Sequence, residues 1–351
     1  MQLDMHYYAT FFLAEYANIP LEDVRRIAYA AQYVDDSTKY DSNQHKDGGL
    51  LYGIASAHHP LDCVKNRLIN GEEQRRVWVP FHFLPGGSGN TFGKKLICMK
   101  NSKIANEMFR NHIENNINKE YQVYLIGVAS HVFMDTFSHY GFSGISSKYN
   151  LVKENSIIPH VKNEKLKKYI LGKKGKFLKD FGLEKVARFL AEYATSALGH
   201  GGAMTFPDRP YLHWELEFVE KHSNHEEMIN RKNKETFLEG CQALYYYLSE
   251  FAKKKYKIVS PDFDTIKKEI ENILAFEGTK IERISKWKNI IKANNIDYDP
   301  NIWEEEKNNF NKYEYSKYGI EANVYRFHQA VSYHRYYILK DLLPKHEIAI
   351  Y

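Results

Sequence analysis

The stretch Ser130-His131-Val132-Phe133-Met134-Asp135-Thr136-Phe137-Ser138-His139-Tyr140-Gly141-Phe142 decides how we expect this chain to fold. It continues an apolar run that starts at Tyr121, and its glycine suits the carboxyl end of a helix. His131, Asp135 and His139 recur every four residues, so all three lie on one face of that helix. The stretch therefore predicts a central helix over about 120–140 that carries a row of potential metal ligands.

The spacing along this helix limits how many metal ions the row can hold. On a straight helix His131 and Asp135 lie about 6 Å apart along the axis and can share one ion, whereas His139 lies roughly 12 Å from His131. Two ions a few ångströms apart, with Asp135 between them, satisfy this spacing. Imidazole and carboxylate ligands suit zinc, with manganese or iron as alternatives. The competing interpretation is a buried structural helix whose histidines pair with Asp135 or with backbone carbonyls.

The composition is that of a soluble globular protein. The chain has 351 residues, of which 43% are hydrophobic and 26% charged. It contains only 20 glycines and 10 prolines, which favours long helices over an all-β design. A net charge of +5 is mildly basic, so the protein tolerates a polyanionic substrate without requiring one.

Cysteine usage and the absence of targeting signals predict a cytoplasmic protein. Cys63, Cys98 and Cys241 are widely spaced and form no C-x-x-C pair, which argues against a disulfide framework and against a cysteine-built zinc site. No signal peptide precedes the first polar residues, and no run of 18 apolar residues occurs.

Helical periodicity extends through the whole chain and predicts an all-α fold with short extended pieces. We expect a metal-binding helical core over 1–220 and a helical C-terminal portion over 221–351, packed together as one domain. The segment 77–84 is β-branched and aromatic, which predicts an extended piece. Helices are expected at about 3–17, 20–36, 101–117, 120–140, 183–198, 211–222, 234–255, 263–275, 279–294 and 321–342.

Further potential ligands lie outside the central helix. Each alone is weak evidence, because residues of these types in such settings more often have a structural role, so their order along the chain is more informative than any one of them. They comprise His6 with Asp4 before it, Asp35 and Asp36 at the end of the second helix, His82 between two phenylalanines, His200 between glycines, Asp208 in a turn, and His213 with Glu217 as a His-x-x-x-Glu pair.

In that order the chain resembles the zinc-dependent phospholipase C family and the single-strand-specific nucleases that share its all-helical, trinuclear-zinc fold. The resemblance covers roughly residues 4–217 and implies a multi-helix bundle with two or three zinc ions, extended by the helical C-terminal portion. The ligands that it implies are His6, Asp35 or Asp36, His82, His131, Asp135, His139, and either His200 with Asp208 or His213 with Glu217.

The chain departs from that family in three respects. Its last helix histidine follows Asp135 by four residues, where the family usually has six. The family uses the free amine of an N-terminal tryptophan as a ligand, whereas this sequence starts at Met1; either Asp4 replaces that ligand, or the ion is weakly held or absent. The family is also mostly secreted. A looser similarity, through Tyr-Val-Asp-Asp and Asp-Thr-Phe-Ser-His-x-Gly-Phe, is to uncharacterised bacterial proteins.

The absence of certain motifs disfavours other classes of metal-dependent hydrolase. No His-Asp dipeptide occurs, which disfavours HD-type phosphohydrolases, and no H-E-x-x-H occurs, which disfavours zincin proteases. The glycine-rich segment 86–95 does not have the spacing of a phosphate-binding loop.

These observations predict a metal-dependent phosphodiesterase in which two zinc ions activate a water molecule. We expect Asp135 to position the metals, Asp35 or Asp36 to orient the nucleophile, and Arg209 or a third ion to neutralise the leaving oxygen. A lysine-rich segment over about 150–180 and 27 tyrosines favour single-stranded nucleic acid or nucleotides as substrate. A phospholipase C-type lipid substrate is the first alternative. A non-catalytic, metal-stabilised scaffold that binds a protein partner is the second.

Overall fold

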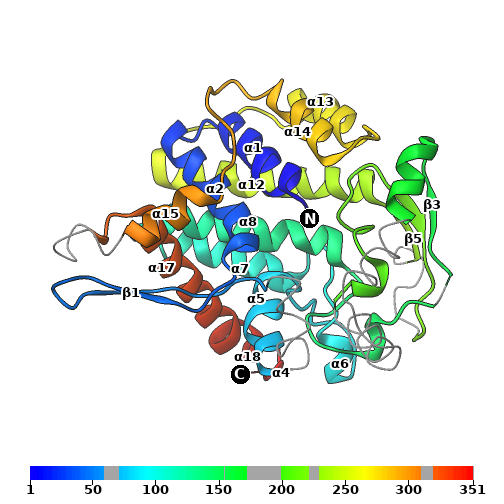
Figure 1. Cartoon of the computed structure of the whole chain (residues 1–351), viewed down its shortest axis with the longest axis horizontal. Helices are drawn as coiled ribbons and strands as arrows, with labels where there is room; N and C mark the ends of the chain where they lie inside the picture. Colours follow the sequence, from blue (N-terminus) through cyan, green and yellow to red (C-terminus); the bar gives the residue numbers. More distant parts are fainter. Residues whose placement is uncertain (59–70, 154, 172–198, 221–228, 310–318, 351) are drawn as a thin grey trace.

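The fold is built around the helix α8 (Gln122–His139), which lies at the centre of the molecule (Figure 1). The computed structural model describes residues 1–58, 71–153, 155–171, 199–220, 229–309 and 319–350. All 18 residues of α8 are buried, as expected for a helix that is apolar on nearly every side. The helices packed around it are α2 (Leu21–Asp36), α7 (Lys103–Glu114), α12 (Asn233–Tyr256) and α17 (Asn323–Tyr336).

The N-terminal helices form where the sequence predicts them. The π-helical segment η1 (Asp4–Ala9) continues directly into α1 (Thr10–Tyr16), within the expected range 3–17. Pro20 precedes α2, and two acidic residues in the first turn interact favourably with the helix dipole. Because α2 buries its apolar side against α8, it brings its carboxyl end close to the potential ligands of the central helix.

Helices from the C-terminal part of the chain complete the core. The C-terminal helices α12 and α17 both pack on α8, so residues from both predicted portions of the chain share one hydrophobic core. None of the helices within the described residues is both long enough and apolar enough to span a membrane. The other helical elements are α4 (Gly71–Glu73), η3 (Gln74–Trp78), α5 (Val79–Phe81), α6 (Phe92–Lys95), η4 (Lys148–Asn150), η5 (Gly201–Ala203), α13 (Asp264–Leu274), α14 (Lys280–Lys288), α15 (Asn301–Asn309), η7 (Tyr337–Leu342) and α18 (Leu343–Lys345).

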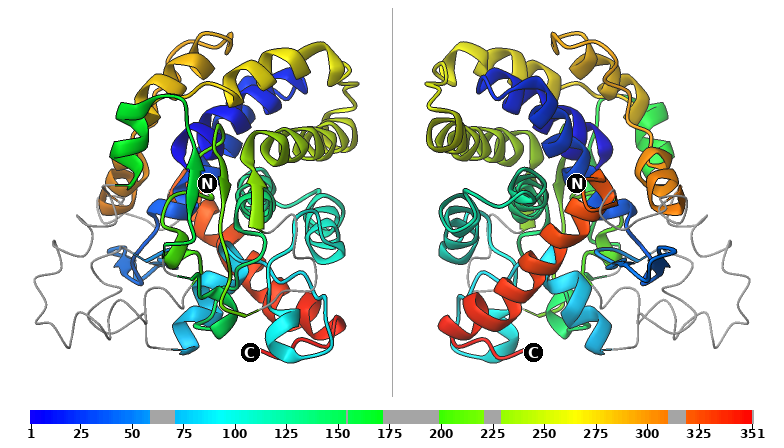
Figure 2. Two further views of the ribbon diagram at one scale, coloured as in Figure 1. Left: turned by 90° about the vertical axis from the view of Figure 1, so that its right-hand side faces the viewer. Right: turned by 90° about the vertical axis from the view of Figure 1, so that its left-hand side faces the viewer.

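Two small antiparallel sheets complete the part of the fold that the structure describes. β1 (Ser42–Gln44) and β2 (Leu50–Tyr52) form a hairpin that projects from one side. β3 (Ile158–His160), β4 (His213–Glu215) and β5 (Asn230–Lys232) form a three-stranded sheet in the order β3-β4-β5. This sheet lies on the side of the molecule where α8 ends (Figures 1 and 2). The mainly helical architecture was predicted, and the three-stranded sheet was not.

Two predicted elements are wrong, and burial explains both. No helix forms over 211–220, the described part of the range expected as 211–222: residues 213–215 are extended and alternate in burial, because Trp214 turns inward while its neighbours face outward. The extended piece predicted over 77–84 is instead helical from 74 to 81, with its apolar residues buried on one side. The helix expected over 183–198 and Cys63 lie outside the described residues.

A glycine allows α8 and α2 to approach closely. A Cβ atom at Gly127 would lie 2.4 Å from the carbonyl oxygen of Ile27 and 2.6 Å from the Cβ atom of Ala30. Backbone atoms cannot move aside as a flexible side chain can, so the two helices would have to separate.

We therefore expect Gly127→Ala to destabilise the protein by about 1–3 kcal/mol through overpacking. Gly240→Ala is the matched control, because a Cβ atom there meets side-chain atoms of Phe137 at 3.0 Å, and alanine favours the helix. Urea unfolding of both variants checks this. Equal losses of unfolding free energy in the two variants would contradict the role of the close backbone contact.

Several buried histidines outside the central row predict acid sensitivity. Burial lowers the pKa of His328 to about 3 and that of His334 to about 4, well below the value of about 6.5 in the unfolded chain. The folded state therefore requires these rings to be neutral. Below pH 6.5 the unfolded chain binds protons that the folded chain does not. The unfolding free energy therefore has the full contribution of these neutral histidines above this pH, and it decreases as the pH falls.

We expect the unfolding free energy of the metal-free protein to decrease between pH 7 and pH 5. Each such histidine contributes up to about 1.4 kcal/mol per pH unit. His328→Gln removes one titrating group and should flatten the curve. Urea titrations at three pH values measure the slope, and a wild-type slope of zero would contradict the argument.

Candidate metal centre

Asp135 lies at the middle of a buried cluster of nitrogen and oxygen donors. Its Oδ1 is 2.6 Å from the amine nitrogen of Met1 and 3.2 Å from Nε2 of His6. Its Oδ2 is 3.2 Å from Nε2 of His131 and 3.3 Å from Nδ1 of His82. These four partners come from the residue Met1 before η1, from η1 itself, from α8 and from the residue after α5, so the fold brings together residues that are up to 134 positions apart.

Four histidines of the cluster share one feature: one ring nitrogen donates a hydrogen bond to a backbone carbonyl. The other nitrogen then carries a lone pair and faces the carboxylates of the cluster. Metal-binding histidines are oriented in this way in proteins. The pairs are His131 Nδ1 with Ala31 O (2.7 Å), His139 Nδ1 with His82 O (2.7 Å), His82 Nε2 with Ser56 O (2.9 Å) and His200 Nδ1 with Met204 O (2.6 Å).

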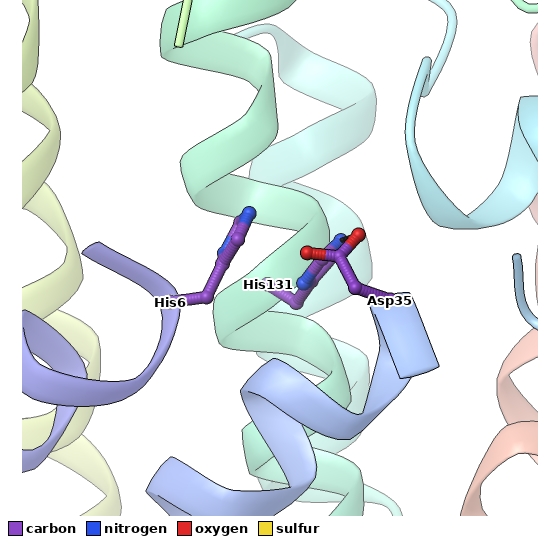
Figure 3. Close-up of side chains that lie close together, drawn as sticks. All are labelled: His6, Asp35 and His131. Carbon is purple, nitrogen blue, oxygen red and sulfur yellow. Dashed lines mark ion pairs between the residues drawn. The ribbon is translucent and has the colours of Figure 1, made fainter. Parts of the chain in front are cut away.

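Three neighbouring groups of donors result. In each group one ligand atom from every side chain lies within 4.8 Å of the others. Figure 3 shows the first group, in which His6, Asp35 and His131 reach toward one another from η1, α2 and α8. The three groups are His6 with Asp35 and His131, His82 with His131 and Asp135, and His139 with His200 and Asp208.

His6 provides the strongest indication that a metal ion belongs here. Its ring is fully buried and stacks on His131 with 3.8 Å between the ring centroids. Within the described residues neither ring nitrogen makes a hydrogen bond: Nε2 lies 3.2 Å from Oδ1 of Asp135 without hydrogen-bond geometry, and a buried polar group left unsatisfied ordinarily costs about 1–3 kcal/mol. Burial lowers the pKa of His6 to about 3, so its nitrogen stays unprotonated and available as a ligand.

The charges of the cluster also suit cations. Asp35, Asp135 and Asp208 place three carboxylates close together, with the Met1 amine as their neighbouring cation. Burial opposes ionisation of Asp135, but His139, the amine and His131 hold its pKa well below the ordinary value. The cluster is therefore ionised, and divalent ions would balance its negative charge. The residues present fit a zinc-type centre with mixed imidazole and carboxylate ligands.

Two members of the cluster are partly exposed to solvent. The side chain of Asp35 is 33% exposed and that of His200 is 21% exposed, whereas Asp135 is 1% exposed. Solvent therefore reaches the cluster at Asp35 and at His200, while Asp135 is shielded from it.

The structure shows which of the two aspartates at the end of α2 faces the cluster. Asp35 reaches the cluster, with Oδ1 3.8 Å from His82 Nδ1 and 3.9 Å from His131 Nε2. Asp36 points away and accepts hydrogen bonds from Tyr298 (2.6 Å) and Gln32 (3.3 Å). Since consecutive helical residues lie about 100° apart, only one of the two can face α8.

The structure also shows which of the two candidate pairs near the end of the predicted ligand set reaches the cluster. His200 and Asp208 join His139, with Asp208 Oδ1 3.1 Å from His139 Nε2. His213 and Glu217 do not join the cluster. The strand β4 turns His213 outward, and Glu217 pairs with Lys153 on the surface.

Asp4 and Arg209 are not placed as predicted either. The carboxylate of Asp4 is bound by Arg283, so it does not replace a terminal amine as a ligand. The amine of Met1 itself lies in the cluster, which the residue pattern alone did not indicate. Arg209 donates hydrogen bonds to Thr205 Oγ1 and to the hydroxyl of Tyr211, so it is engaged away from the metal ligands.

Comparison with known proteins places the chain in a family without giving it an activity. The model of DUF6765, a family of unknown function, matches residues 1–342. The chain belongs to the DUF6765 family. No curated protein and no solved structure matches it. For this DUF6765 protein, the chemistry must therefore be argued from the cluster itself.

A buried ion pair holds the N-terminal segment of the DUF6765 chain at the cluster. Arg283 of α14 binds Asp4 with Nε 2.7 Å from Oδ2 and Nη2 3.2 Å from Oδ1. It also donates to the side chain of Gln2 (2.6 Å) and to the carbonyl of Gly278 (2.8 Å). Both charged side chains are fully buried. The C-terminal third of the chain thus fixes the segment that carries Met1 and His6.

We expect Arg283→Met to lower the unfolding free energy by about 3–5 kcal/mol, because it leaves the Asp4 carboxylate buried without its partner. The double variant Asp4→Asn, Arg283→Met removes both charges and should be less destabilised than the single variant. Urea unfolding compares the two. If the double variant is as unstable as Arg283→Met, the unpaired charge is not the cause.

Proposed function

We propose that the protein is a metal-dependent phosphoesterase, with phosphodiesters as its substrates and zinc as its preferred ion. One observation carries the proposal: the lone pairs of five imidazoles and three carboxylates converge in one partly open cluster. Imidazole and carboxylate donors in this mixture suit zinc, with manganese or iron as substitutes.

The arrangement of the donors supports a cluster of two or three ions. The first two groups share His131, and the carboxylate of Asp135 contacts donors on both of its oxygens. Neighbouring ions about 3.5–4 Å apart are a common arrangement in enzymes that hydrolyse phosphate esters. Bound there, divalent ions would supply an activated water nucleophile and neutralise charge on the phosphoryl oxygens.

The residues of the chain have distinct parts in this proposal. Asp135, buried and held ionised, orients the ligands around it. Asp35 is near the ligand atoms of His82 and His131 but is one-third exposed, so its carboxylate can accept a proton from an incoming water. Since Arg209 is engaged elsewhere, the group His139, His200 and Asp208 is the better candidate to hold an ion near the leaving oxygen.

The substrate is proposed from charge and from the resemblance to zinc-dependent phospholipases C and single-strand-specific nucleases. Lys162, Lys165 and Lys168 are exposed on the described part of the lysine-rich segment. Exposed lysines attract a phosphodiester backbone through a salt-dependent interaction. Single-stranded nucleic acid or a nucleotide is therefore preferred over a phospholipid.

Asp35→Asn and Asp36→Asn provide a matched test of the proposal. The two residues are adjacent and lose the same charge, but only Asp35 faces the cluster. We expect Asp35→Asn to reduce hydrolysis of bis(p-nitrophenyl) phosphate and of single-stranded DNA by more than about 100-fold, and Asp36→Asn to retain most activity. Elemental analysis of both variants and of Asp135→Asn measures bound zinc, manganese and iron.

Two results would overturn the proposal in different ways. Full metal content without hydrolysis of any phosphodiester would indicate a structural metal scaffold that binds a partner. A wild-type protein free of metal, also after incubation with zinc, would make the histidines structural. Hydrolysis of lipid vesicles but not of DNA would keep the reaction and change the substrate.

A further inference from the structure

The outer face of the three-stranded sheet carries two histidines and a glutamate side by side. His160 of β3 is directly opposite His213 of β4, with 4.5 Å between their ring centroids. Glu215 is two residues further along β4, so it projects from the same face. Nε2 of His160 is 2.8 Å from Oε1 of Glu215. One ligand atom from each side chain lies within 4.8 Å of the other two.

We propose that His160, His213 and Glu215 form a second, peripheral site for one divalent transition-metal ion. Two imidazoles and one carboxylate are the ligand types of zinc, nickel and copper, and they disfavour magnesium and calcium, which require mainly oxygen ligands. Three protein ligands leave a coordination position for water or for a further ligand.

The surroundings of His213 support metal binding. Its Nε2 is 2.8 Å from Oδ1 of Asn230 on the neighbouring strand β5. When the amide oxygen accepts the Nε2 proton, Nδ1 keeps its lone pair and the ring is held in one orientation. A partner of this kind on the second ring nitrogen is typical of histidines that bind metals.

The sheet holds the three ligands in place without a metal. Its inner face is anchored by Arg231, which donates to the carbonyls of Tyr140 (2.7 Å) and Ser138 (2.6 Å), next to the end of α8. Trp214 is fully buried and donates to Asn233. Little ordering is therefore needed on binding, which favours affinity.

Stability does not account for the group on the outer face. The side chains of His160 and Glu215 are 43% and 46% exposed, and an exposed ion pair of this kind stabilises a fold very little. The buried residues of the other face already stabilise the sheet. The site is separate from the central cluster, because its ligands point away from the core to which Trp214 and Arg231 are directed.

Equilibrium dialysis against zinc, followed by elemental analysis, tests the proposal. The wild type should bind one equivalent more than His160→Asn or His213→Asn, and Asp135→Asn should retain this equivalent while it loses ions of the central cluster. Asn230→Ala should weaken the site by about tenfold. Glu215→Gln should also lose this equivalent of zinc, whereas the matched control Glu217→Gln should keep it. Glu217 is an exposed carboxylate on the same segment, and it pairs with Lys153.

Copper bound to the Asp135→Asn variant gives a second measurement. Electron paramagnetic resonance should show nitrogen couplings from two imidazoles, and from one after His160→Asn. Identical zinc content in the wild type, His160→Asn and His213→Asn would overturn the proposal. So would a loss of the same equivalent in Glu217→Gln, which would indicate unspecific binding to surface carboxylates. Neither result bears on the central cluster.

Discussion

The structure depends on one buried carboxylate, that of Asp135, which belongs to a central helix that solvent does not reach. A buried charge is costly unless it is paired, so the segments around Asp135 must supply partners for it. The amine of Met1, His6, His82 and His131 do so, and each comes with a fixed orientation. The same requirement that makes the core stable also assembles a set of donors suited to metal ions.

Backbone carbonyls determine which way those donors point. The carbonyl oxygens of Ala31, in the second half of α2, and of His82, directly after α5, accept hydrogen bonds from His131 and His139, so the packing of helices on α8 sets the orientation of the rings. The close contact at Gly127 has the same effect, because it brings α2 near enough for its carbonyl to reach His131. The packing of helices on α8 therefore also fixes the geometry of the candidate metal ligands.

The described residues of the C-terminal portion, 221–351, support the cluster without supplying one of its donors. Arg283 binds Asp4 and Gln2, and so holds the first residues of the chain beside α8. Arg231 binds the carbonyls of Ser138 and Tyr140 on either side of His139, and connects the three-stranded sheet to the same region. Two buried arginines thus link the outer parts of the fold to the central cluster, one at each end of it.

The sequence by itself determined the central helix, its row of His131, Asp135 and His139, and most of the surrounding helices, because apolar periodicity and helical spacing are local properties. Only the tertiary structure decided between Asp35 and Asp36, and between His200 with Asp208 and His213 with Glu217. Those choices depend on which side of an element faces α8. The short strand β4 was missed because its alternation is set by the burial of Trp214 against distant residues. The roles of Met1 and Arg283 depend on contacts across more than 130 positions, which no local pattern encodes.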